Sequence, residues 1–249
     1  MGTLRALLFY AGISVTALLF SLLGILLLPL PFHPRYRAVT LWTHSTLWWL
    51  RICCGLSYRV RGREHIPPGP AIILCKHQSA WETMALQQVF PPQVWVFKRE
   101  LLWIPFFGWG LAVLDPIAVD RSAKRKALKQ LITDGKERLG RGIWITLFPE
   151  GTRVAPGKKG EYHAGGGLLA KEANVPVVPV AHNAGLFWPK RSFAKRPGTI
   201  DLVVGPCIDP AGKSARQIMD IAENWIESTS LSLLPAGETP APDATATDR

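Results

Sequence analysis

Hydrophobic positions form one long uninterrupted run near the start of the chain and short, regularly interrupted runs after it. From Ala6 to Pro34 no residue is charged. The apolar run Leu7 to Leu28 is long enough to cross the roughly 30 Å hydrocarbon core of a bilayer as a helix. A cleaved signal peptide fits poorly, because the run is too long and no small-x-small cleavage site follows it. We therefore expect residues 1–56 to be a membrane-anchoring helical segment.

A second apolar segment, Ala38 to Leu50, contains three tryptophans and follows three prolines. It is short for a membrane span, and tryptophan favours the headgroup region. The anchor is thus either a helical hairpin dipped into one leaflet or a single crossing. Arginines are more frequent after the first run than before it, and this bias favours a catalytic domain on the cytoplasmic face of a bacterial inner membrane.

Beyond the anchor, strand-like apolar runs alternate with segments of helical periodicity. This alternation predicts an α/β domain over residues 57–232, with a largely parallel central sheet flanked by helices. Residues 233–249, rich in Ala, Pro and Thr, are predicted to be a disordered tail. The predicted strands are Tyr58 to Arg61, Ala71 to Cys75, Gln93 to Phe97, Pro116 to Val119, Gly142 to Leu147, Pro176 to Ala181 and Thr199 to Val204. The predicted helices are Trp81 to Val89, Ala123 to Leu139, Gly166 to Ala173 and Ala215 to Ser228.

Charge and cysteine content narrow the classes of partner. The formal net charge is +11, and the basic residues concentrate between Lys98 and Lys159. They could form a solvated helix face, or bind anionic lipid, an anionic substrate or nucleic acid. The membrane anchor favours lipid, and no nucleic-acid motif accompanies the charge, so we expect no nucleic-acid partner. The four cysteines have no C-x-x-C spacing, which argues against a metal site.

The first chemical motif, His77 with Glu82, follows the predicted strand that ends at Cys75. A neutral imidazole can take a proton from a hydroxyl, and a carboxylate on its other nitrogen would fix the tautomer. The alternative is a capping box, in which Ser79 and Glu82 cap a helix. Residues five apart on one helix point about 140° apart. His77 can therefore meet Glu82 only from the turn before the helix, which the capping box itself provides.

The second motif, Glu150-Gly151-Thr152-Arg153, follows the predicted strand Gly142 to Leu147. Gly151 allows close backbone approach, Thr152 supplies a hydroxyl, and the Arg153 guanidinium fits phosphate oxygens. The alternative is a simple turn with a surface ion pair between Glu150 and Arg153, which would contribute little. Together the two motifs predict proton abstraction from a hydroxyl next to a bound anion.

Four segments in order resemble the conserved blocks of the 1-acylglycerol-3-phosphate acyltransferases. They are KHQSAWE (Lys76 to Glu82), VFKRELLWIPFFGWGLAVLDPIAVDR (Val96 to Arg121), LFPEGTR (Leu147 to Arg153) and VPVVPVAHNAG (Val175 to Gly185). The resemblance implies transfer of a fatty acyl group from an acyl thioester to the sn-2 hydroxyl of 1-acylglycerol 3-phosphate (lysophosphatidate), giving phosphatidate in phospholipid biosynthesis. The co-substrate would be acyl-CoA or acyl carrier protein, and no other cofactor is implied.

The resemblance also implies roles for individual residues. His77 would be the general base and Glu82 its orienting carboxylate. The residues expected around the glycerol phosphate are Lys98, Arg121, Glu150, Gly151, Thr152 and Arg153. The chain departs from the usual pattern at Glu82, where the family most often has Asp, and at His163, where it usually has a lysine.

The sequence leaves three alternatives open. The acceptor could be glycerol 3-phosphate or a different lysophospholipid. The chain could instead be a noncatalytic membrane-binding relative, although such a protein would be expected to lack His77, Glu82 or Arg153. The aromatic stretch Trp103 to Trp109 could pack against core or membrane, or could form a wall of an acyl tunnel.

Overall fold

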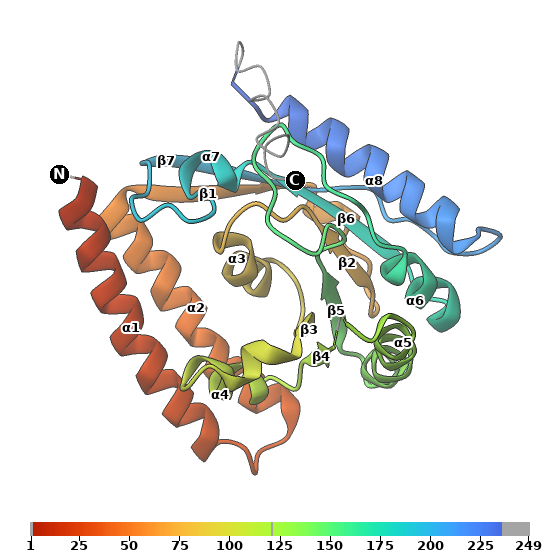
Figure 1. Cartoon of the computed structure of the whole chain (residues 1–249), viewed down its shortest axis with the longest axis horizontal. Helices are drawn as coiled ribbons and strands as arrows, with labels where there is room; N and C mark the ends of the chain where they lie inside the picture. Colours follow the sequence, from red (N-terminus) through yellow and green to blue (C-terminus); the bar gives the residue numbers. More distant parts are fainter. Residues whose placement is uncertain (1, 121, 236–249) are drawn as a thin grey trace.

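Seven strands form a central sheet with helices on both of its faces (Figure 1). The structure, a computed structural model, describes residues 2–120 and 122–235. The strands lie in the order β1-β7-β6-β2-β5-β3-β4, and every neighbouring pair is parallel except β6 with β7. The predicted α/β class with a largely parallel sheet is confirmed. The strands are β1 (Leu56–Arg61), β2 (Ile72–Cys75), β3 (Gln93–Lys98), β4 (Ile117–Val119), β5 (Trp144–Leu147), β6 (Val177–His182) and β7 (Gly198–Val204).

Figure 1 shows α1 to α4 on one side of the sheet and α5, α6 and α8 on the other. All four predicted helices of the catalytic domain are present, with ends shifted by at most a few residues. The α-helices are α1 (Gly2–Leu26), α2 (Phe32–Cys54), α3 (Trp81–Val89), α4 (Phe107–Ala112), α5 (Lys124–Gly140), α6 (Gly165–Ala173), α7 (Ala184–Phe187) and α8 (Ala215–Ser232). Two short 3-10 turns are η1 (Arg63–His65) and η2 (Arg99–Trp103). Most of the predicted tail, residues 236–249, lies outside the described residues.

Side chains of β2 alternate between the two faces of the sheet, as the strand period of two requires. Ile72 and Leu74 pack in the cluster that contains the inner faces of α5, α6 and α8. Ile73 and Cys75 pack in the cluster formed with α2 and α3. The two residues that follow the strand are therefore set on opposite sides, Lys76 toward α8 and His77 toward α3.

Helices α1 and α2 pack together as an N-terminal hairpin. Trp49 Nε1 donates to the carbonyl of Leu8 at 3.2 Å, and Trp42 Nε1 donates to Thr16 Oγ1 at 3.1 Å. The helices approach so closely that a Cβ on Gly12 would overlap the Trp49 indole ring, which would have to shift. Within the described residues, α1 is the one helix long and apolar enough to cross a membrane by length and composition.

Helix α2 begins six residues earlier than the predicted segment, at Phe32 rather than Ala38. Pro34 lies in its first turn, where a backbone N–H has no intrahelical acceptor and a proline is tolerated. At its other end, Gly55 takes a left-handed conformation (φ 64°) and terminates the helix immediately before β1.

Candidate active site

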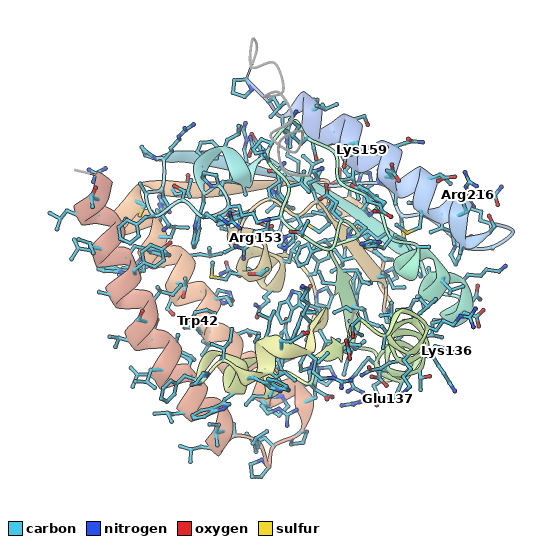
Figure 2. The ribbon with its side chains drawn as sticks, viewed as in Figure 1. Trp42, Lys136, Glu137, Arg153, Lys159 and Arg216 are labelled. Atoms are coloured by element: carbon cyan, nitrogen blue, oxygen red, sulfur yellow. The ribbon has the colours of Figure 1, made fainter. Side chains whose placement is uncertain are left out.

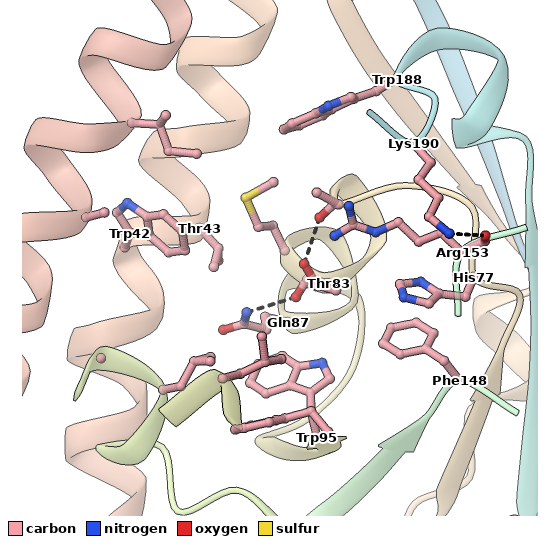
Figure 3. Close-up of a pocket in the computed structure, with 18 of the residues that line it drawn as sticks. Trp42, Thr43, His77, Thr83, Gln87, Trp95, Phe148, Arg153, Trp188 and Lys190 are labelled. Atoms are coloured by element: carbon pink, nitrogen blue, oxygen red, sulfur yellow. Dashed lines mark hydrogen bonds between the residues drawn. The ribbon is translucent and has the colours of Figure 1, made fainter. Parts of the chain in front are cut away.

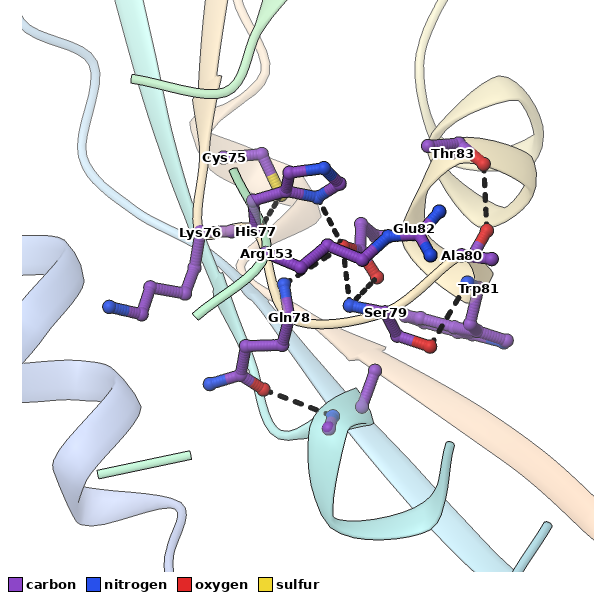
Figure 4. Close-up of polar contacts among 12 residues, drawn as sticks. Cys75, Lys76, His77, Gln78, Ser79, Ala80, Trp81, Glu82, Thr83 and Arg153 are labelled. Carbon is purple, nitrogen blue, oxygen red and sulfur yellow. Dashed lines mark hydrogen bonds and ion pairs between the residues drawn. The ribbon is translucent and has the colours of Figure 1, made fainter. Parts of the chain in front are cut away.

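His77 and Glu82 meet in the turn between β2 and α3 (Figure 4). His77 Nδ1 lies 2.8 Å from Glu82 Oε1. The same carboxylate accepts the backbone N–H groups of Gln78 at 3.0 Å and of Ser79 at 2.8 Å, and it is fully buried. A buried carboxylate with this many donors fixes the geometry of the turn and of the imidazole together.

Only one of the two hydrogen bonds of the expected capping box is formed. Glu82 reaches back to the N–H of Ser79, but the Ser79 hydroxyl accepts the N–H of Trp81 at 3.2 Å rather than that of Glu82. The reason is local: Ala80 occupies the cap position in a helical conformation, so Ser79 lies one residue too early for the usual bond. Capping and the His77–Glu82 contact nevertheless use the same side chain at the same time.

The charge state of Glu82 determines which nitrogen of His77 carries a hydrogen. Burial raises the pKa of Glu82, but the neighbouring His182 and His77 rings and the backbone N–H of Ser79 outweigh it and leave the pKa below its ordinary value. The carboxylate is therefore charged and accepts the His77 Nδ1–H. In the neutral imidazole, His77 Nε2 then carries no hydrogen and can accept one.

Neighbouring groups hold the His77 ring and backbone from two further directions. Phe148 stacks on the imidazole, with centroids 4.1 Å apart and planes inclined by 19°. The N–H of Val154 donates to the His77 carbonyl at 2.8 Å, so the residue directly after the second motif is bonded to His77.

His182, which was not among the residues expected at the site, lies fully buried at the end of β6. Its Nε2 donates to the Lys76 carbonyl at 2.8 Å and its Nδ1 accepts the N–H of Ala184 at 3.2 Å. Burial lowers its pKa, although the Glu82 carboxylate 3.8 Å away opposes that change. This neutral ring braces the backbone that carries His77. The sequence feature that could have indicated His182 is a histidine as the last residue of an apolar strand, close to the position of His77 just after β2.

On the opposite face of the sheet, Lys76 is buried in a cluster of charges. Its ammonium lies 2.6 Å from Glu150 Oε1 and 2.7 Å from Glu227 Oε1 of α8, and it donates to the Lys158 carbonyl at 2.9 Å. Glu150 also accepts the N–H of His77 at 3.1 Å. Burial raises the pKa of Glu150, and the Lys76 ammonium opposes this. The cluster connects both motifs to the last helix.

A cavity of about 880 Å³ opens beside His77 and extends to the N-terminal hairpin (Figure 3). His77, Gly151, Thr152 and Arg153 line its polar end, together with Lys190 and Arg191, which no sequence motif indicated. Lys98 also lines the cavity. Its other end is apolar and is lined by residues of α1, α2 and α4, including Ile13, Ala17, Phe20, Val39, Trp42 and Leu111. This shape suits an amphiphile with an anionic head and a hydrocarbon tail.

Two residues with an expected or possible phosphate contact are not part of this lining. Glu150 lies behind the turn, paired with Lys76, so neither a direct role at the cavity nor a surface pair with Arg153 matches its position. His163 is exposed, and its backbone N–H donates to the carbonyl of Pro149. Arg121, expected in the same set, lies outside the described residues.

The other basic residues lie mostly away from the cavity. Arg125, Lys126, Lys129 and Lys136 are exposed on α5, and Figure 2 shows Lys136 at the periphery while Arg153 lies near the centre. Their expected lipid partner stays a prediction. In the described part of the chain, no three His, Cys, Asp or Glu side chains are grouped to hold a metal ion.

Known proteins resemble this chain in both sequence and fold. Residues 57–183 match the Acyltransferase family. The 1-acyl-sn-glycerol-3-phosphate acyltransferase of Pseudomonas aeruginosa is 46% identical over 237 residues, which cover 93% of this chain and 92% of that protein. The enzyme of the same name from Saccharomyces cerevisiae is 30% identical over 77% of this chain and 65% of its own length. The crystal structure of the Thermotoga maritima 1-acyl-sn-glycerophosphate acyltransferase has the same fold, with a TM-score of 0.76 at 23% identity over 93% of this chain and 95% of that chain. The chain therefore belongs to the 1-acyl-sn-glycerol-3-phosphate acyltransferase family.

Proposed function

We infer that this chain is a 1-acylglycerol-3-phosphate O-acyltransferase, which converts lysophosphatidate into phosphatidate in phospholipid biosynthesis. The observation that carries the conclusion is the cavity itself, which has a base and several cations at one end and hydrocarbon-lined walls at the other. Lysophosphatidate has the matching parts: a phosphate, a free hydroxyl next to it, and one acyl chain.

For the chemical step, His77 Nε2 takes the proton of the sn-2 hydroxyl as its oxygen attacks the thioester carbonyl. A new carbon–oxygen bond forms, the carbon–sulfur bond breaks, and the proton passes from the imidazolium to the leaving thiolate. Glu82 stabilises the imidazolium through its bond to Nδ1. General-base catalysis of this kind contributes about 10²–10⁴ in rate.

The cations at the polar end are assigned to the acceptor phosphate. Arg153, Lys98, Gly151 and Thr152 all line the cavity that opens beside His77. Holding the phosphate there keeps the adjacent hydroxyl within reach of Nε2, which converts binding into orientation. Arg121 belongs to the proposed set by resemblance, and Glu150 acts through the backbone of His77 rather than on the phosphate.

The apolar end is assigned to an acyl chain, and each methylene buried there contributes about 0.8 kcal/mol. The outward side of α1 exposes a row of leucines, and Trp103, Phe106 and Trp109 are exposed near α4, which packs on α1. We propose that these surfaces lie in the bilayer, with the catalytic domain at the cytoplasmic face of a bacterial inner membrane. The acceptor would then enter directly from the lipid.

An activity matrix in mixed micelles tests the assignment, with acyl-CoA and acyl carrier protein as donors. The acceptors are lysophosphatidate, glycerol 3-phosphate and lysophosphatidylcholine. We expect the largest kcat/KM with lysophosphatidate. A preference for lysophosphatidylcholine would contradict the assignment of lysophosphatidate as acceptor, because the phosphate of lysophosphatidylcholine is a diester and not a terminal monoester. A preference for glycerol 3-phosphate, which has no acyl chain, would contradict the proposal that the apolar end of the cavity binds the acyl chain of the acceptor.

A further inference from the structure

Four basic side chains line the cavity, and two of them lie outside every segment that resembles the family. Lys98, Arg153, Lys190 and Arg191 come from three separate parts of the chain. Among the residues that the structure describes, none of the four forms a salt bridge with a carboxylate. Other cations of this chain, such as Lys76 and Arg138, do have acidic partners. Uncompensated positive charge at the mouth of a cavity attracts anionic ligands.

Lys190 lies directly against the turn that carries Arg153 (Figure 3). Its ammonium donates to Thr152 Oγ1 at 3.2 Å and to the Arg153 carbonyl at 3.3 Å. An ammonium has three hydrogens, so one remains for a ligand after these two bonds. An anion bound at this turn is therefore within reach of Lys190 as well.

The segment that carries Lys190 and Arg191 is fixed in place. Lys195 is 7% exposed, and its ammonium lies 3.6 Å from the ring centre of Tyr10 on α1 and 4.7 Å from that of Trp188. It also donates to the carbonyl of Phe193 at 2.8 Å. Cation–π contacts of this kind strengthen when they are removed from water. The segment is thus anchored to α1 and holds its basic side chains at a defined position.

The backbone conformation of Arg191 also indicates that surrounding contacts hold this segment in place. Its φ is 65°, in the left-handed region that non-glycine residues rarely adopt. Such a conformation is strained and persists where surrounding contacts impose it, often at ligand-binding sites. Here it turns the chain immediately after Lys190, at the rim of the cavity.

We propose that Lys190, with Arg191, forms a phosphate-binding rim that completes the site begun by Arg153. The ligand is a phosphate group of one of the two substrates: the monoester of lysophosphatidate, or a phosphate of the acyl-CoA donor. The inference rests on the proposed function, because it assigns these residues to that reaction.

Steady-state kinetics of three variants test the proposal. Lys190→Met removes the ammonium, Lys190→Arg keeps a cation, and Arg196→Gln removes a charge from the same segment at an exposed position outside the cavity lining. KM is measured separately for lysophosphatidate and for acyl-CoA, with melting temperature as a parallel readout. Loss of one charged hydrogen bond to phosphate raises KM about 10- to 100-fold. We expect that increase in Lys190→Met, substantial recovery in Lys190→Arg, and no change in Arg196→Gln.

The outcomes distinguish three roles of Lys190: binding the phosphate of lysophosphatidate, binding a phosphate of acyl-CoA, or only bracing the turn that carries Arg153. A higher KM for lysophosphatidate alone assigns the rim to the acceptor, and a higher KM for acyl-CoA alone assigns it to the donor. Unchanged KM values, or a change equal to that of Arg196→Gln, would overturn the proposal. A fall in kcat and melting temperature without a KM change would also overturn it, since Lys190 would then only brace the turn. Failure of the proposed function is distinct, because the unmodified protein would then not acylate lysophosphatidate.

Discussion

Replacing Lys76 with methionine should destabilise the protein severely, although the residue never touches the cavity. The Lys76 side chain is 1% exposed, and its ammonium lies within 2.7 Å of two carboxylates. The side chain of Glu150 is fully buried and that of Glu227 is 15% exposed. Removing one partner of a buried ion pair leaves uncompensated charge and costs about 3–5 kcal/mol. For a domain of this size, 1 kcal/mol corresponds to about 2–4 °C in melting temperature, so the expected decrease is roughly 6–20 °C.

The chain offers a matched control in Lys159, which forms a salt bridge with Glu223 of the same helix, α8. The Lys159 side chain is 59% exposed, and solvent screens an exposed pair so that it contributes little to stability. Lys159→Met should therefore lower the melting temperature far less than Lys76→Met does. The assay is thermal unfolding of purified protein in detergent, followed by near-ultraviolet circular dichroism. Equal decreases in the two variants would refute the reasoning from burial.

A double variant tests whether the cost arises from the unpaired carboxylates. The cluster holds two carboxylates and one ammonium, so Glu227→Gln removes one excess negative charge. Adding it to Lys76→Met should recover part of the lost stability, because contacting residues are not additive. Further loss in the double variant would show that Glu227 stabilises the protein through other contacts, such as the hydroxyl of Tyr162 at 2.7 Å.

Two other predictions concern the buried partners of His77. Glu82→Gln should lower kcat about 10²- to 10⁴-fold, because the amide cannot stabilise an imidazolium as a carboxylate does, and an unchanged kcat would contradict this role. Glu82→Asp should retain most of the rate, which the same assay checks. Burial lowers the pKa of His182, so below about pH 6.5 the unfolded chain binds a proton that the folded chain does not. The free energy of unfolding should then fall as pH decreases from 7 to 5, by up to about 1.4 kcal/mol per pH unit, and His182→Gln should reduce that slope in urea titrations; identical slopes would count against it.

The strands were predictable because the apolar runs that make them are short, well separated and bounded by turns. All seven formed near their expected positions. Helix α4 was not predicted, because it is six residues long and lies in a stretch rich in glycine and aromatic residues without helical periodicity. It is held by packing on α1, which is a tertiary contact that a local pattern does not contain.

The chemistry of the site was predictable only where its partners are close in sequence. His77 and Glu82 are five residues apart, and the capping pattern showed how Glu82 could reach His77 in the turn, although it did not by itself decide between a cap and a catalytic pair. Lys76 and Glu227 are 151 residues apart, and no local signal connects them. Glu150 illustrates the limit: its place in a turn beside Arg153 suggested the cavity, yet its side chain pairs with Lys76 behind it.

The central claim is that His77 Nε2 removes the proton from the acceptor hydroxyl. The most direct measurement is the single-turnover rate of acyl transfer to lysophosphatidate by purified His77→Ala, compared with the unmodified protein at saturating substrates. We predict a decrease of at least about 10²-fold. Melting temperature should fall less than in Lys76→Met, because Glu82 keeps the backbone donors of Gln78 and Ser79 when the ring is removed. An equal rate in the two proteins would contradict the mechanism.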